Sequence, residues 1–435
     1  MKKQTSAQIL KKLTAFAIPL ILSGMLQQLF NWVDALIVGN VIGETALAAV
    51  GATASVYNLF VTLIVGFTSG LSVLAAQQFG QGKETENHEL LSGYSVLCGG
   101  ICFACALVGM LFMEPILLRM QTPAALLPNA KDYLQIVFVG IPFLAIYNVY
   151  SAVLRGMGNS RLPFFAVLVS SVTNAVLDLV FVVVLDWGVA GAAAATTMAV
   201  VAMTLFVIGY TAVRYPQFRR FRWGSGALLR TGAKYGAPPA IQSSVSSVGG
   251  VFLQRFMNGF GEQTVAAITT TYRVDLILLL PIINLSTAIS TLVAQETGAE
   301  NPEQAKQIFR IGTALMAVLS LLLTVFVVAA GGHMIAIFGL TPESVQIGRD
   351  FFRAIAPFYV VYGLAISVKG YLEGVSDLLF SGITGICALV VRLACSYLFA
   401  GVFDNMVVAY AEAFSWIFML LVFLIRYGIK QRPKS

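Results

Sequence analysis

The sequence is a succession of long apolar runs separated by short polar loops. Each run is long enough to cross the hydrocarbon core of a bilayer, about 30 Å thick, as an α-helix. Only 11% of the residues are charged and 58% are hydrophobic, whereas soluble domains carry about 25% charged residues. We therefore predict an all-α polytopic membrane protein with twelve transmembrane helices, near residues 13–42, 46–79, 87–114, 126–155, 161–185, 188–214, 230–258, 264–297, 304–332, 344–373, 378–402 and 405–429.

The basic residues are distributed unevenly between the two sides of the predicted membrane. Nineteen of the 27 Lys and Arg fall on one side, and only Arg119, Lys131, Arg349 and Arg353 fall on the other. This is the positive-inside asymmetry, which predicts that both termini lie in the cytoplasm. The net charge of +7 is therefore explained by topology, and no nucleic-acid partner is expected.

A shift of 218 positions brings the two halves of the chain into register. It aligns GETALAAV (43–50) with GEQTVAAI (261–268), AQQFG (76–80) with AQETG (294–298), and LRGMGN (154–159) with LEGVSD (372–377). Because each unit has an even number of spans, both have the same orientation, and a pseudo-two-fold axis along the membrane normal should relate them. We predict two six-helix lobes, 1–214 and 230–435, joined by a cytoplasmic linker, 215–229.

The first span carries an acidic residue, Asp34, well inside the predicted membrane. Gly24, Gln27, Asn31 and Asp34 recur at spacings of three and four, so they share one helical face. An ionisable residue within a span normally faces a protein interior or a water-filled cavity and indicates a functional site. The alternative is that Asp34 reaches the headgroups or caps a neighbouring helix.

Three spans of the first half place oxygen-bearing side chains at one depth. Asp178 and Asn174 lie four residues apart in the fifth span, and Thr196 lies in the sixth. At 1.5 Å per residue, Asp34, Asp178 and Thr196 each lie about 12 to 14 Å from the outer end of their spans. Oxygen ligands in this arrangement suit a hard cation such as Na+, and a pair of carboxylates also suits a proton relay.

The second half does not repeat this cluster. At the shift of 218, Asp34 aligns with Phe252, Asn174 with Arg392, Asp178 with Ser396 and Thr196 with Phe414. We therefore assign cation coupling to the first lobe. The second lobe has other charges predicted to be buried, for which structural ion pairing and cavity lining both remain open: Arg255, Arg273, Asp275, Lys369, Arg392 and Glu412.

Several motifs in fixed order resemble the multidrug and toxic compound extrusion (MATE) family. They are FNWVDALIVGNVIGETALAA after a proline-bearing start of the first span, AAQQFGQGK, LRGMGNSRLP, NAVLD and GVAGAAAAT. The resemblance covers nearly the whole chain and implies a two-lobe antiporter that exports organic cations in exchange for Na+ or H+. The family's first-lobe cation site matches Asp34, Asn174, Asp178 and Thr196. A second-lobe site with an acid in the seventh span has no counterpart here.

The hypothesis from the sequence is a secondary antiporter in a prokaryotic cytoplasmic membrane, acting as a monomer on organic cations or drugs. No cofactor beyond the coupling ion, Na+ or H+, is expected. The candidate substrate-cavity residues are Gln27, Asn31, Tyr147, Arg255, Arg273, Asp275 and Arg392. The first alternative is a flippase for lipid-linked precursors from the same superfamily, which would favour a strongly cationic cavity. A membrane-embedded enzyme or receptor is a remote alternative, because no Walker loop, HExxH or GxSxG motif occurs.

Overall fold

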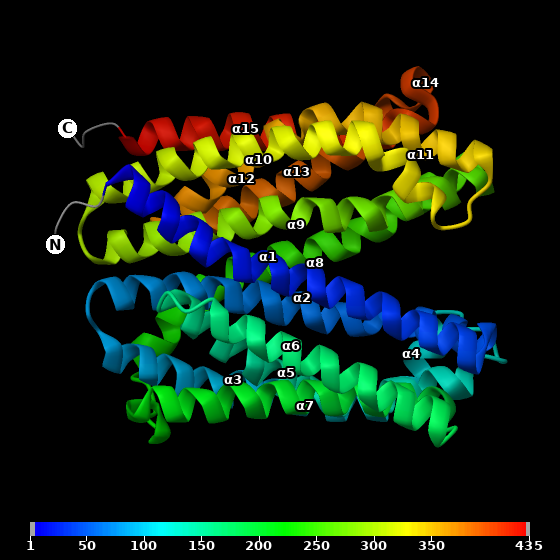
Figure 1. Cartoon of the computed structure of the whole chain (residues 1–435), viewed down its shortest axis with the longest axis horizontal. Coiled ribbons are helices and arrows are strands. Elements are labelled where there is room, and N and C mark those ends of the chain that lie inside the picture. The colour runs from blue at the N-terminus through cyan, green and yellow to red at the C-terminus, as the bar shows by residue number, and fades with distance from the viewer. Residues whose placement is uncertain (1–4, 432–435) are drawn as a thin grey trace. The chain divides into compact units, whose positions relative to one another are not determined.

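The computed structural model describes residues 5–431, and no strand occurs among them (Figure 1). The chain forms two compact units. One unit comprises residues 22–240, and the other combines the residues up to 21 with those from 241 onward. Two helices, α1 (Ser6–Ile37) and α8 (Gly226–Met257), therefore contribute to both units.

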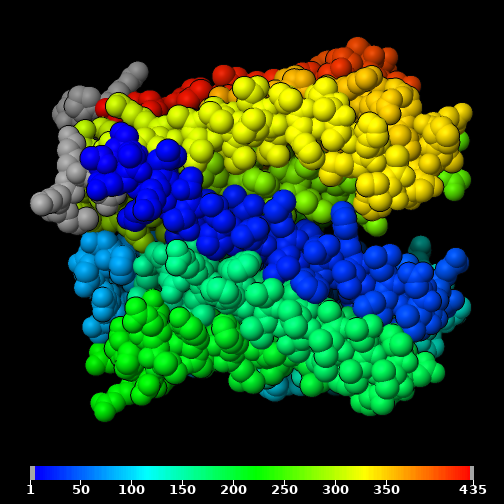
Figure 2. All heavy atoms as spheres, in the orientation of Figure 1, coloured from blue at the N-terminus to red at the C-terminus, as the bar shows by residue number. Residues whose placement is uncertain are grey.

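The unit 22–240 is built around α5 (Leu127–Gly156). This helix packs against α2, α3 and α7, and α6 packs on α7. In Figure 2, spheres of α6 and α7, in the green part of the colour scale, cover part of the face of this unit that is turned to the viewer, and blue spheres from the N-terminal part of the chain cover another part. The other helices of the unit are α2 (Glu44–Gly80), α3 (Glu84–Leu111), α4 (Met113–Arg119), α6 (Arg161–Asp178) and α7 (Gly188–Arg214).

The other unit has one large hydrophobic core. Within it, α9 packs against α10 and α12, and α13 packs against α15. Its helices after α8 are α9 (Glu262–Gly298), α10 (Pro302–Ala336), α11 (Pro342–Ile355), α12 (Tyr359–Gly374), α13 (Leu378–Leu398), α14 (Ala400–Phe403) and α15 (Val407–Gln431).

Eleven segments among the described residues are long and apolar enough to cross a membrane. The predicted span that is missing from these eleven is 230–258, which forms the helix α8 of 32 residues. Its length of about 48 Å at 1.5 Å per residue is sufficient for a span. However, its sequence is rich in Gly, Ser, Gln and Pro. Its mean hydropathy is therefore too low for it to count among the eleven apolar segments.

The tenth predicted span is interrupted at a proline. The segment 344–373 forms two helices, α11 and α12, separated by a 3₁₀ turn at Ala356–Phe358 that contains Pro357. Proline has no backbone N–H to donate, and its ring clashes with the preceding turn of an α-helix. Pro357 thus lies where the chain breaks between two helices, whereas Pro142 lies inside the continuous helix α5.

The backbone repeats its turn geometry in the two halves. Ten of the eleven positive φ angles among the described residues form pairs 218 positions apart: 43 and 261, 82 and 300, 121 and 339, 158 and 376, and 186 and 404. The exception is Gly188. Positive φ is uncommon outside glycine, so five coincidences at one spacing are strong evidence of a shared architecture. The predicted duplication is confirmed.

The glycine of the repeated LxG motif marks a close approach of two helices. A Cβ atom on Gly156 in α5 would lie 2.9 Å from the carbonyl oxygen of Ser72 in α2. A Cβ on Gly374 in α12 would lie 2.8 Å from the carbonyl oxygen of Ser290 in α9. Small residues allow membrane helices to pack this closely, which explains why both halves carry the motif.

The substitution Gly156→Ala should therefore destabilise the protein by about 1 to 3 kcal/mol, because the added methyl group forces the two helices apart. Gly100→Ala in α3 is a matched control, since nothing lies within 4 Å of its Cβ position and alanine has the higher helix propensity. Denaturant titration in mixed micelles measures both effects. Equal stability of the two variants would contradict the close-packing account.

Candidate cation-coupling site

Both carboxylates of the predicted site lie next to irregular helical turns in the unit 22–240. Asp34 is in the last turn of α1, and Asp178 is the last residue of α6. A π-helical segment follows each helix, Val38–Ile42 after α1 and Leu179–Val184 after α6, and these two segments contact each other. Such π-helical turns often occur at functional sites.

The carboxyl groups of Asp34 and Asp178 face each other. They lie close enough for one of them, when protonated, to donate a hydrogen bond to the other. Asp178 is only 1% exposed. One oxygen of Asp34 and both oxygens of Asp178 are buried without a hydrogen-bond partner from the described part of the chain. Because two negative charges repel strongly in a medium of low dielectric constant, the pair favours a proton or a small cation between them.

The other two predicted site residues lie beside the pair. Asn174 precedes Asp178 by one turn of α6, and its side-chain Nδ2 is also buried without a partner among the described residues. Thr196, on α7, is partly buried, and its hydroxyl group bonds with that of Tyr133 on α5. Native proteins rarely leave several buried polar atoms unpaired in one place unless water, an ion or a functional role accounts for them.

A tyrosine near the pair, Tyr133, was missed by the sequence analysis. The hydroxyl group of Tyr133 interacts electrostatically with Asp34 and Asp178. It also interacts with a second tyrosine, Tyr57. At the shift of 218, Tyr133 aligns with Phe351, so only the first half has a hydroxyl group there. Comparing the two halves for hydroxyl groups as well as carboxylates would have found this residue.

A small hydrophobic cluster packs around the π-helical turns. It contains Val38 and Val182, one from each π-helical segment, together with the ring of Tyr133 and with Val189 and Ala193 of α7. Val38 and Val182 are each 1% exposed. This apolar packing fixes the ends of α1 and α6, and thus the positions of the two carboxylates, and keeps water from the helix ends.

The candidate cavity residues of this unit have different environments. Gln27 and Asn31 are exposed on α1, on the helical face that carries Asp34. The Nδ2 group of Asn31 donates a hydrogen bond of 3.3 Å to Gln28. Tyr147 is 5% exposed, lies in a hydrophobic cluster and donates a hydrogen bond of 3.3 Å to the carbonyl of Pro163. Its hydroxyl group thus links α5 to α6.

In the other unit, the expectation that Arg255 and Arg273 are buried is wrong, because both are exposed. Arg255 lies in the last turn of α8, where a cation interacts favourably with the helix dipole. Arg273 and Asp275 are two residues apart on α9 and therefore point in different directions. Asp275 is the inward-facing residue and is 3% exposed.

A buried charge network surrounds Asp275. The hydroxyl group of Tyr359 donates a hydrogen bond to Asp275. Arg392 forms an ion pair with Glu412 at 2.8 Å and donates a hydrogen bond of 2.6 Å to the hydroxyl of Tyr272. The structural ion pairing that the sequence left open is therefore present for Arg392 and Glu412.

Comparisons with known proteins match the chain along most of its length. The MatE family model matches twice, at residues 19–180 and 238–398. The probable multidrug resistance protein YpnP of Bacillus subtilis is 27% identical to the chain, and the alignment covers 86% of this chain and 84% of YpnP. The probable multidrug resistance protein YoeA of the same organism is 26% identical, and the alignment covers 89% of this chain and 86% of YoeA.

The fold is also that of a solved structure, a multidrug resistance MATE family transporter of the MOP superfamily in an outward-facing conformation. The two chains are 21% identical, with a TM-score of 0.89 over 99% of this chain and 98% of the other. The two matches to the family model reproduce the internal duplication of the sequence. The chain belongs to the MatE family, the multidrug and toxic compound extrusion transporters.

Proposed function

We propose that the protein is a secondary active antiporter that exports organic cations or drugs in exchange for Na+ or H+. The observation that carries the proposal is the facing pair of carboxyl groups, Asp34 and Asp178, whose buried oxygens have no partner in the described part of the chain. Relatives described as multidrug resistance proteins support the substrate class.

The chemistry of the pair explains how an ion gradient would drive export. With both carboxylates ionised, the site is strongly anionic and attracts either a small cation or an organic cation. Binding of Na+ or H+ from outside neutralises the site, so an organic cation is released there. Loss of the ion to the cytoplasm restores the negative charge, and the next substrate binds. The two duplicated units would alternate the access of this site between the two sides of the membrane.

The basic residues of the loops support an orientation with both termini in the cytoplasm. We accordingly place the protein in the cytoplasmic membrane of a prokaryotic cell, where a gradient of Na+ or H+ is available. We propose a monomer, because each chain carries both duplicated units. The roles of Asn174 and Thr196 are to add an amide and a hydroxyl oxygen to the carboxylates when Na+ is bound.

The proposal is tested with the purified protein in liposomes. Uptake of a fluorescent organic cation is measured first under an imposed Na+ gradient and then under an imposed pH gradient, with protein-free liposomes as the control. Transport that follows one of these gradients is expected and identifies the coupling ion. If neither gradient drives transport, the antiporter proposal fails, and lipid-linked precursors become the substrates to test, as the flippase alternative predicts.

A further inference from the structure

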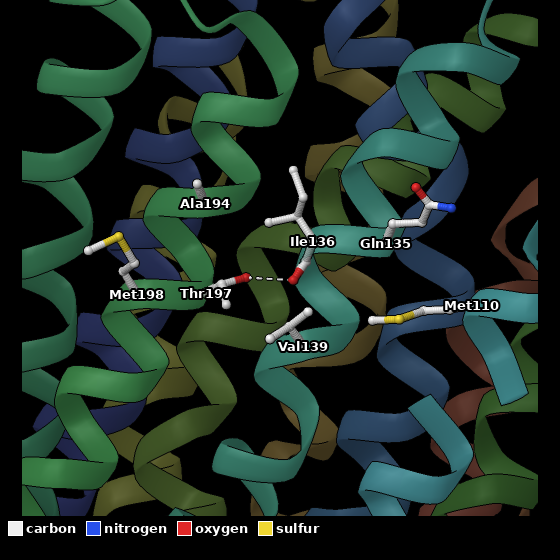
Figure 3. Close-up of a pocket in the computed structure, with 7 residues that line it drawn as sticks. All are labelled: Met110, Gln135, Ile136, Val139, Ala194, Thr197 and Met198. Atoms are coloured by element: carbon white, nitrogen blue, oxygen red, sulfur yellow. Dashed lines mark hydrogen bonds between the residues drawn. The ribbon is translucent and has the colours of Figure 1, made fainter. Parts of the chain in front are cut away.

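Two adjoining cavities open on the unit 22–240, and neither Asp34 nor Asp178 lines them. The first has a volume of about 420 Å³ and lies between α3, α5 and α7. Figure 3 shows its lining: Met110 from α3, Gln135, Ile136 and Val139 from α5, and Thr197 and Met198 from α7. Apart from Gln135 and Thr197, the side chains that line this cavity are apolar. The hydroxyl group of Thr197 is already hydrogen-bonded, because it donates to the carbonyl of Ile136 at 3.0 Å.

The second cavity continues the first toward the end of the helices. Its volume is about 410 Å³, and it shares Met110 and Gln135 with the first. Its lining also contains Glu114, from the short helix α4, and Lys131, near the start of α5. The Nζ atom of Lys131 lies 2.8 Å from Oε2 of Glu114. One continuous groove therefore has an apolar end and an end with one positive and one negative charge.

The depth of each end along α5 matches the layers of a bilayer. From Leu127, where α5 begins, Lys131 lies about 6 Å and Val139 about 18 Å along the helix at 1.5 Å per residue. The charged end is therefore at the level of lipid headgroups, and the apolar end reaches into the hydrocarbon layer. An amphipathic molecule with an acyl chain and a charged headgroup fits both ends at once.

We propose that this groove is a binding site for a phospholipid with a phosphoethanolamine headgroup. The acyl chain would lie along Ile136, Val139 and Met198. The phosphate would pair with Lys131, and the ammonium group, with three N–H donors, would pair with Glu114. Gln135, where the two cavities meet, presents an amide that can bond to the glycerol ester.

The charges of the groove favour this headgroup over others. A purely anionic headgroup would leave Glu114 without a cation, and a choline headgroup has no N–H to donate to the carboxylate. The existing ion pair does not prevent binding, because the side chains of Lys131 and Glu114 are 38% and 52% exposed and such surface pairs contribute little stability. The headgroup can replace the direct pair with two charge-assisted contacts.

The groove lies directly behind one wall of the cation-coupling site. Thr197 lines the groove, while the preceding residue, Thr196, bonds with Tyr133 beside the carboxylates. A bound acyl chain would fill the space behind the contact of α5 with α7. The proposal itself concerns lipid binding and does not depend on which ion is transported.

The test is native mass spectrometry of the full-length protein in detergent with phosphatidylethanolamine, phosphatidylcholine and phosphatidylglycerol of identical acyl chains. Val139→Trp fills the apolar end, and Val96→Trp is the matched control, because the two valines are 52% and 50% exposed and Val96 is not among the lining residues of either cavity. We expect Val139→Trp to reduce phosphatidylethanolamine adducts about tenfold, and Val96→Trp to leave them at the wild-type level.

The headgroup contacts are tested with the double substitution Lys131→Gln and Glu114→Gln. It should abolish the preference for phosphatidylethanolamine and leave a similar, weak binding of all three lipids. Equal binding of the three lipids by the wild-type protein would overturn the proposal. Wild-type adduct levels in Val139→Trp would overturn it as well, since the lipid would then be bound elsewhere.

Discussion

The substitution Asp34→Asn is expected to reduce ion-driven transport of an organic cation by at least an order of magnitude while leaving the folded state intact. Asparagine has nearly the same shape as aspartate, but it carries no charge and cannot exchange a proton. It also removes the repulsion between two buried carboxylates, so the free energy of unfolding should fall little, if at all. Initial uptake rates in liposomes of equal protein content measure the effect.

The control for this substitution is Asp132→Asn at the start of α5. Asp132 is exposed and is not part of the carboxylate pair, so its replacement should leave the transport rate near the wild-type value. Asp178→Asn should reproduce the loss seen with Asp34→Asn, because the two carboxyl groups act as one site. Full transport by either variant of the pair would show that coupling occurs elsewhere in the chain.

The largest effect on stability is expected for Arg392→Met in the second unit. In the described part of the chain, Arg392 is the basic group near two acidic residues, Glu412 and Asp275. The side chains of Arg392 and Glu412 are only 19% and 11% exposed. Breaking a buried ion pair by removing one partner leaves an uncompensated charge and costs about 3 to 5 kcal/mol. Denaturant titration in mixed micelles should show a loss of about this size.

Glu412→Gln is the informative comparison for Arg392→Met. It removes one of the two acidic groups and leaves Arg392 with Asp275, so the numbers of positive and negative charges then match. We therefore expect a smaller loss of stability than for Arg392→Met. The opposite order would contradict the charge-balance argument, because it would show that the loss of Glu412 costs more stability than the loss of the cation it pairs with.

Much of the architecture could be predicted from the sequence, because the determining signals are local or repeated. Apolar runs of sufficient length specify spanning helices, and the shift of 218 specifies the duplication that the φ angles confirm. The break between α11 and α12 also has a local cause, because Pro357 lies in the turn that separates them. The segment 230–258 was predicted as a span together with the other apolar runs, although the helix it forms, α8, is not among the segments apolar enough to cross a membrane.

At the candidate site, the structure brings the two predicted carboxyl groups together, but it also contains features that the sequence did not predict. Spacing and rise per residue selected Asp34 and Asp178, whose carboxyl groups face each other in the structure. The π-helical segments after both helices could not be predicted, because they depend on the packing of Val38 and Val182 with residues of other helices. The participation of Tyr133 depends on the same tertiary contacts.

Orientation around a helix was harder to predict than depth. Arg273 and Asp275 lie two residues apart in sequence, but Arg273 is exposed whereas Asp275 is buried, with 3% of its surface accessible. The sequence around them is apolar on several faces, so it does not specify which of the two charges faces the protein. Tyr147 illustrates the same difficulty, since its hydroxyl bonds to a backbone carbonyl of α6 that no sequence pattern identifies.

The central claim is that the carboxylate pair couples an ion to substrate movement, and the most direct test reverses the reaction. Proteoliposomes with an imposed gradient of organic cation, and no ion gradient, are monitored for changes in internal Na+ and pH. The wild-type protein should move one of these ions against the flow of the organic cation, whereas the double substitution Asp34→Asn and Asp178→Asn should move neither. Ion movement by the double variant at the wild-type rate would contradict the account.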